Sequence, residues 1–241
     1  MVPEDKIDDF VRRVREAAGA NVRSIILYGS AVSGDFHPEF SNLNMFCVLH
    51  DSSFPAFWAL APVMKWWDRQ KQPPPLCMTR AELERSTDVF TIELIDMQQH
   101  HRVLFGEDVL QGLQIPMQVH RIQVEYELRE KVTLLRQQLL LAADNNSRLW
   151  EVLVRSVSSF VTLFRHALIA LGTPVPAVKR EAVQTLSKQV GFNPSSINEV
   201  LDVREHKVRP RKADIKDLCA RYVAAVEQVT SVVDRKLDSG T

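Results

Sequence analysis

The sequence predicts an α+β protein of two domains, in which an α/β domain is followed by an all-helical domain. Over the first part of the chain, apolar strand patterns alternate with amphipathic helix patterns, and this alternation is typical of α/β domains. From Val119 onward the strand patterns stop and helical periodicity continues to the end. We therefore expect an α/β domain at residues 1–113 and a helical bundle at residues 119–241.

The composition is that of an ordinary globular protein. Thirty basic residues balance thirty acidic ones, so a formal net charge of zero gives no general attraction to nucleic acid or to an anionic membrane. The N-terminus lacks a signal pattern, and no run of about 18 uncharged apolar residues occurs. We therefore expect a cytoplasmic protein with no nucleic-acid partner and no membrane partner.

The three cysteines, Cys47, Cys77 and Cys219, are far apart in the sequence. Their spacing is neither that of a zinc site nor that of a disulfide framework. We expect reduced and mostly buried thiols.

The first domain begins with a helix and two strands. Ile7, Phe10 and Val14 follow the spacing of an amphipathic helix that ends at Gly19. Near-continuous apolar residues at 24–28 and 42–49 then predict two strands that are buried on both faces.

The rest of the first domain alternates in the same way. A helix is expected from about Ser53 to Arg69, and a short strand at 76–78 follows three prolines that exclude a helix. Thr79 and Glu82 form a capping-box pattern, which predicts a short helix through Arg85. Residues 88–95 are interpreted as a strand that carries Glu93, and residues 97–103 as a helix.

The second domain is interpreted as a bundle of helices. Helices are expected from Val119 to about Asp144, from Ser147 to Leu171, over 178–190, after Asn193, and over 213–237. The helix from Ser147 is apolar on nearly every side, so we expect it at the centre of the bundle.

One stretch between the first two strands indicates a family. It runs from Tyr28 to Leu49 as YGSAVSGDFHPEFSNLNMFCVL. It resembles the signature of the nucleotidyltransferase superfamily, which has Gly-Ser after a strand, a loop of about ten residues, and an Asp-apolar-Asp pair on the next strand of a mixed sheet. The matching residues, which the resemblance implies as nucleotide-binding, are Gly29, Ser30, Gly34 and Ser41.

The two aspartates of the signature are replaced here by Asn42 and Asn44. Alternate residues of a strand share a face, so the resemblance implies one site formed by both positions together with a third carboxylate, for which Glu93 is the first choice and Asp96 the second. In the family these carboxylates hold Mg²⁺, which prefers anionic oxygen ligands. An asparagine keeps the shape and loses the charge, which leaves Glu93 as the metal ligand of the three.

Other polar residues in or near the loop could replace a lost carboxylate, although loss is the simpler interpretation. They are Asp35, His37, Glu39 and Asp51. His100 and His101 are interpreted as surface or satisfied core residues, because neighbours on a helix diverge by roughly 100° and cannot face one ion.

These observations lead to one functional interpretation and two alternatives. We interpret the chain as a catalytically degenerate nucleotidyltransferase-fold protein that binds a nucleotide or a protein partner and needs no cofactor. The first alternative is an active, Mg²⁺-dependent enzyme that moves a nucleoside monophosphate from a triphosphate to a hydroxyl of a small molecule or protein. The second is a structural or interaction protein with an empty cleft.

Overall fold

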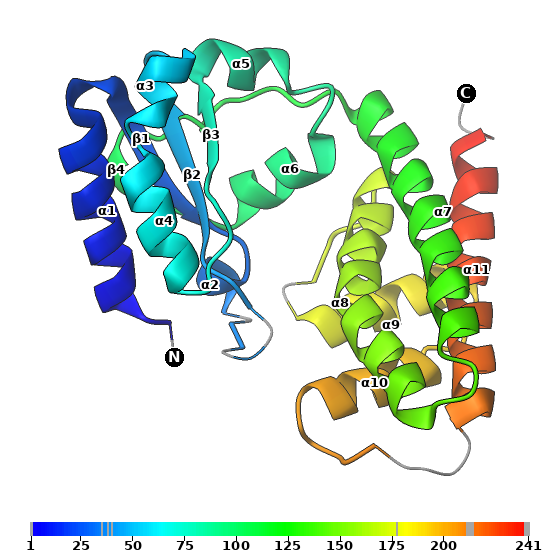
Figure 1. The fold of residues 1–241 in the computed structure, drawn as a ribbon. Coiled ribbons are helices and arrows are strands. Elements are labelled where there is room, and N and C mark those ends of the chain that lie inside the picture. The colour runs from blue at the N-terminus through cyan, green and yellow to red at the C-terminus, as the bar shows by residue number, and fades with distance from the viewer. Residues whose placement is uncertain are drawn as a thin grey trace. The chain divides into compact units, whose positions relative to one another are not determined.

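The computed structural model describes residues 2–34, 36–37, 39, 41–176, 178–210 and 215–238 (Figure 1). The chain separates into two compact units, Met1–Pro116 and Met117–Thr241. The first unit contains a mixed sheet with helices, and the second is helical, which confirms the predicted fold class.

The sheet has four strands in the described part of the chain. They are β1 (Val22–Tyr28), β2 (Asn44–Leu49), β3 (Leu76–Thr79) and β4 (His101–Gly106), in the order β3-β2-β1-β4. β1 pairs antiparallel with β2 and β4, while β2 pairs parallel with β3. The two central strands are almost fully buried, as their continuous apolar sequences predict.

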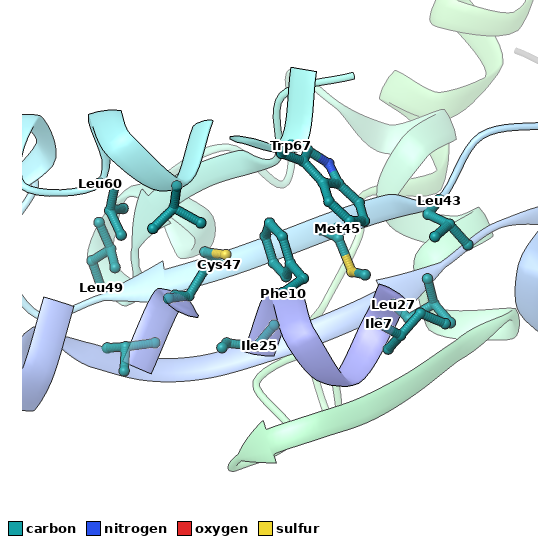
Figure 2. Close-up of a cluster of buried hydrophobic side chains, with 13 residues drawn as sticks. Ile7, Phe10, Ile25, Leu27, Leu43, Met45, Cys47, Leu49, Leu60 and Trp67 are labelled. Atoms are coloured by element: carbon teal, nitrogen blue, oxygen red, sulfur yellow. The ribbon is translucent and has the colours of Figure 1, made fainter. Parts of the chain in front are cut away.

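Helices cover the two faces of this sheet differently. On one face, which we call the α1 face, α1 (Glu4–Ala18) and α4 (Ala61–Arg69) pack on alternate residues of β1 and β2, among them Ile25 and Met45 (Figure 2). On the other, which we call the α6 face, α5 (Arg80–Arg85) and α6 (Thr91–Gln99) pack on the intervening residues, among them Ile26 and Phe46. Because successive side chains of a strand point to opposite faces of the sheet, the core of this unit is divided into two clusters.

The largest departure from the sequence prediction concerns residues 88–106. The predicted strand at 88–95 is wrong, since α6 begins at Thr91 and carries Glu93 in its first turn. The predicted helix at 97–103 is also wrong, because β4 begins at His101. The apolar residues of TIELID fit both the period of a strand and the period of a helix. The pairing of strands decided between the two, because β4 covers the edge of β1 that would otherwise be open.

The predicted helix from Ser53 to Arg69 is divided in two. α3 (Phe54–Trp58) ends before α4 begins at Ala61, and Pro62 lies in the first turn of α4. A proline lacks a backbone donor and its ring clashes with the carbonyl four residues earlier, so a continuous helix is broken there.

The second unit consists of long helices with short connections. They are α7 (Met117–Leu141), α8 (Asn146–Ala170), α9 (Lys179–Val190), α10 (Ser195–Arg204) and α11 (Ile215–Asp238). The cap of α8 is Asn145, whose side chain accepts from the backbone N–H of Arg148 at 3.1 Å, rather than the predicted Ser147. By length and composition α8 could cross a membrane, but half of its apolar window is buried inside the unit, as in the core helix of a bundle.

Candidate functional site

The candidate site begins where β1 ends. Gly29 follows Tyr28 with φ +77° and leads into the four-residue helix α2 (Ser30–Ser33). Its N–H donates to the carbonyl of His100 at 3.1 Å, and its carbonyl accepts from Val32 and Ser33 at 2.9 and 3.1 Å. A positive φ is easy only for glycine, so this residue fixes the sharp turn after the strand.

Asn44 lies directly beside this turn. It is the first residue of β2 and the register partner of Tyr28. A Cβ atom placed on Gly29 would lie 3.0 Å from Asn44 Nδ2, which is tighter than almost all real contacts of a Cβ atom. The missing side chain of Gly29 therefore makes room for the Asn44 amide, and the two fit together in one compact arrangement of turn and strand.

Asn42 is placed differently from Asn44. It precedes β2 and is exposed, so the strand begins two residues later than the sequence predicts. The neighbouring Leu43 is buried, and its N–H donates to Gln72 Oε1 at 2.8 Å, which fixes the chain just before the strand. The structure therefore brings Asn44 to the turn and leaves Asn42 at the surface.

Gly34 and Ser41 shape the loop between the turn and β2. Gly34 ends α2 in the left-handed region with φ +83°. The Ser41 hydroxyl accepts from the backbone N–H of His37 at 3.0 Å, and the Ser41 N–H donates to the His37 carbonyl at 2.8 Å. These two bonds tie Ser41 to His37.

Among the described carboxylates in or near the loop, Asp51 lies away from Asn44. Asp51 follows the opposite end of β2, where it accepts from the N–H and the hydroxyl of Ser53. Glu39 is exposed, and Asp35 lies outside the described residues.

Glu93 is on a helix and not on a strand. Its side chain is exposed, in the first turn of α6. Burial and then the negative charge of Glu93 raise the pKa of Tyr28. Tyr28 packs on the α6 face, and it is the strand partner of Asn44. Tyr28 is therefore paired with Asn44 and feels the charge of Glu93.

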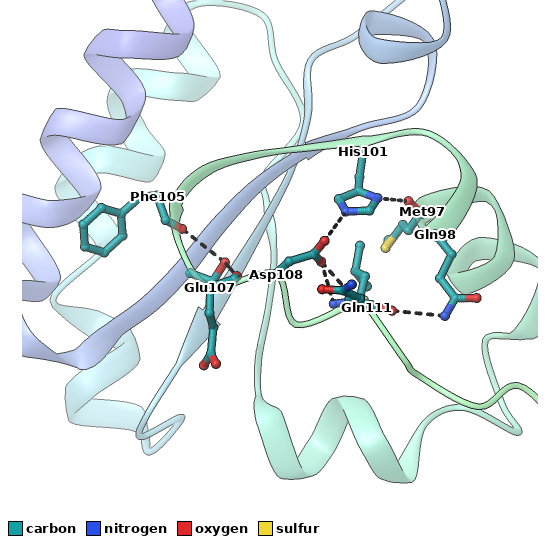
Figure 3. A network of polar contacts seen from close by, with 9 residues as sticks. Met97, Gln98, His101, Phe105, Glu107, Asp108 and Gln111 are labelled. Carbon is teal, nitrogen blue, oxygen red and sulfur yellow. Dashed lines mark hydrogen bonds and ion pairs between the residues drawn. The ribbon is translucent and has the colours of Figure 1, made fainter.

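A polar network that the sequence did not predict lies on the other side of Tyr28. His101, the first residue of β4, pairs in register with Tyr28. Its Nδ1 lies 2.8 Å from the Met97 carbonyl oxygen, and its Nε2 lies 3.1 Å from Asp108 Oδ2 (Figure 3). The other Asp108 oxygen accepts from two backbone N–H groups, so the carboxylate fixes the chain after β4.

His101 lies between two polar partners, the Met97 carbonyl and the Asp108 carboxyl group. Burial acts to raise the pKa of Asp108, but hydrogen bonds from His101, Leu110 and Gln111 outweigh it and hold that pKa below its usual value. His101 is thus held in a structural contact, which agrees with the expectation of a satisfied histidine.

The residues at the turn do not fit a divalent metal site of the family type. Asn42 and Asn44 offer neutral carbonyl oxygens, and Glu93 is the one carboxylate of the three. Within the ranges that the structure describes, no group of three or more His, Cys, Asp or Glu side chains could hold a metal ion. Mg²⁺ requires anionic oxygens or substrate phosphates, so this donor set does not form a site by itself.

No protein-family model matches this sequence, and no curated protein matches it. Its structure is similar to that of spectinomycin adenyltransferase AAD(9) from Enterococcus faecialis, solved with ATP and spectinomycin. The TM-score is 0.56 and the identity 14%, over 90% of this chain and 98% of that chain. This likeness shows a nucleotidyltransferase-like two-domain fold, as the signature around Gly29 and Ser30 predicts.

Proposed function

We propose that this protein is a catalytically degenerate nucleotidyltransferase-fold protein whose first unit binds a nucleotide at the Gly29–Ser30 turn without a divalent metal. The phosphates lie against the backbone of Gly29, the hydroxyl of Ser30 and the amide of Asn44. Transfer of a nucleoside monophosphate does not follow, because an amide cannot act as a general base and the donor set does not hold Mg²⁺.

The observation that carries this proposal is the position of the Asn44 amide beside Gly29. Asn44 Nδ2 lies 3.0 Å from the place of a Gly29 Cβ, so an amide group occupies the turn where the family has a carboxylate. A carboxylate there repels a triphosphate unless a metal lies between them, whereas an amide N–H donates to a phosphate oxygen. Replacing aspartate with asparagine therefore removes the need for a metal and keeps an anion-compatible turn.

The fold similarity supports a nucleotide as the ligand. The adenyltransferase that the chain resembles was solved with ATP. Glycine allows close approach of the backbone to a ligand, and Gly29 keeps that property here. We place the protein in the cytoplasm, where nucleotides are available.

Calorimetric titration of the full chain with ATP tests the proposal, once in chelator and once with excess Mg²⁺. We expect binding in both conditions, with dissociation constants within about threefold of each other, since the site supplies no metal ligands. Binding that requires Mg²⁺ would support the active transferase instead. If a protein partner and not a nucleotide occupies this surface, ATP will not bind in either condition.

A charge change at Asn44 sharpens this test. The variant Asn44→Asp places a carboxylate beside Gly29, so we expect metal-free ATP binding to weaken at least about tenfold, which corresponds to about 1.4 kcal/mol. The matched control is Asn145→Asp, which makes the same chemical change at the cap of α8, where Asp serves as well as Asn. Equal affinity of the Asn44 variant and the parent in chelator would contradict the assignment of Asn44 to the phosphate site.

A further inference from the structure

Two cysteines that are far apart in the sequence meet in the sheet. Cys47 on β2 and Cys77 on β3 are register partners in the parallel pairing of these strands. Both side chains belong to the α1 face, where Cys47 is fully buried and Cys77 is partly buried against the same cluster. Figure 2 shows Cys47 between β2 and the helices of that face. The two thiols are therefore neighbours on one side of the sheet.

The spacing of these strands suits a disulfide. Neighbouring strands lie about 4.7–4.9 Å apart, and disulfides join residues whose Cα atoms are about 4.4–6.8 Å apart. β3 is the edge strand in the order β3-β2-β1-β4, so it has one neighbour in the sheet and can adjust toward β2. Cys47 is held in the centre of the core and cannot move as easily.

The two thiols also differ in a way that suits a stepwise reaction. Cys77 is only partly buried at the boundary of the core, whereas Cys47 is fully enclosed. The hydrogen bond with Cys47 lowers the pKa of the Cys77 thiol against the effect of burial, and that contact together with burial raises the pKa of Cys47. Since the thiolate is the nucleophile, Cys77 is the residue that reacts first.

We propose that Cys47 and Cys77 form a reversible thiol–disulfide site. The Cys77 thiolate attacks a small oxidised disulfide of the glutathione type, forms a mixed disulfide and displaces one thiolate. Cys47 then loses its proton and attacks the Cys77 sulfur, which releases the second small thiolate. The protein loses two protons and two electrons, and the reagent is reduced to two thiols. An excess of the reduced small thiol reverses both steps.

The cross-link would tie the edge strand to the strand that begins at Asn44. It would also close the segment between β2 and β3, which contains α3 and α4, into a loop. Closing such a loop restricts the unfolded chain and stabilises the folded one. The site therefore connects the redox state of the surroundings to the stability of the first unit, whether or not that unit binds a nucleotide.

The experiment treats the folded full chain with oxidised glutathione, blocks the remaining thiols under denaturing conditions, and maps the peptides by mass. We expect a peptide pair joined through Cys47 and Cys77, with the loss of two hydrogens, and Cys219 recovered as a blocked thiol. A glutathione adduct that persists on Cys77, or cross-linking that involves Cys219, would overturn the proposal.

Two variants keep the test independent of folding defects. Cys77→Ser should prevent cross-linking at the edge strand, while the matched change Cys219→Ser in the helical unit should leave it intact. The oxidised parent should melt about 5 °C or more above the reduced parent, and the Cys77 variant should show no such shift. An oxidised parent that melts at the same temperature as the reduced one, or below it, would contradict the stabilising cross-link.

Discussion

The two faces of the sheet use the same strands for different purposes. On the α1 face the side chains are apolar and enclosed, and Trp67 packs on Phe10 with ring centroids 4.5 Å apart. On the α6 face the core gives way, at the end of β1, to Tyr28 with Asn44 and His101 as its strand partners. One face is closed by packing, and the other ends in polar groups beside the turn.

This difference teaches how the polar turn can vary while the packed face stays the same. Alternating residues of a strand point to opposite faces, so a substitution at Asn44 changes the charge beside the α6 face and replaces no side chain of the α1 face. The stability of the first unit should therefore depend on the α1 face, and ligand binding on the turn beside the α6 face.

The largest effect should come from Trp67→Ala on the α1 face. Trp67 is fully buried, so its removal leaves a cavity, and we expect unfolding to become easier by about 3–5 kcal/mol in urea titrations. ATP affinity of the folded fraction should not change. The adjacent Trp66, partly buried beneath Arg13, is the matched control, and Trp66→Ala should cost much less. Similar losses at both positions would remove the distinction between enclosed and peripheral packing.

An intermediate effect is expected from Gly29→Ala at the turn. Its backbone, with φ +77° and ψ −145°, is open essentially to glycine alone and costs another residue about 1–3 kcal/mol, and the new Cβ would meet the Asn44 amide at 3.0 Å. Gly34→Ala is the comparison, because Gly34 is in the more permissive left-handed region and nothing lies within 4 Å of the position that a Cβ would take there. We expect Gly29→Ala to lose more stability than Gly34→Ala in chemical denaturation and to weaken ATP binding as well. Equal losses would contradict both the stricter backbone of Gly29 and its close fit to Asn44.

A smaller effect is expected from the pair of His101 and Asp108. The pKa of Asp108 is depressed in the folded state, so its contribution to stability is present above the unfolded pKa of about 3.9 and is lost as pH falls through the folded value. Asp108→Asn should lower the free energy of unfolding by about 1 kcal/mol at pH 6, and the difference from the parent should shrink below pH 4. A difference between parent and variant that stays constant across this range would exclude a contribution from the charge of Asp108.

Local signals in the sequence predicted much of this structure. The continuous apolar runs indicated the two central strands, and the capping box of Thr79 and Glu82 is present, with Thr79 Oγ1 accepting from the Glu82 N–H at 3.2 Å. These features depend on residues that are close in sequence. The signature at Gly29 predicted the fold for the same reason.

The remaining features depend on the pairing of strands that are far apart in the sequence, and local sequence patterns do not predict that pairing. Glu93 was placed on a strand because its apolar neighbours fit two periods, and the pairing of β4 with β1 decided the outcome. The contact of His101 with Asp108 depends on the same pairing. Cys47 and Cys77 meet only through the register of β2 and β3, which no spacing of cysteines in the sequence reveals.

The most direct test of the central claim is the effect of Mg²⁺ on thermal stability, measured for the parent and for the double variant Asn42→Asp with Asn44→Asp. The variant places a carboxylate at each of the two signature positions with almost no change in volume. It should melt below the parent in chelator, because like charges repel, and gain stability when Mg²⁺ is added, because a ligand of the folded state stabilises it. The parent should change little. A parent that gains as much stability from Mg²⁺ as the variant would contradict the claim that the asparagine pair makes this site independent of metal.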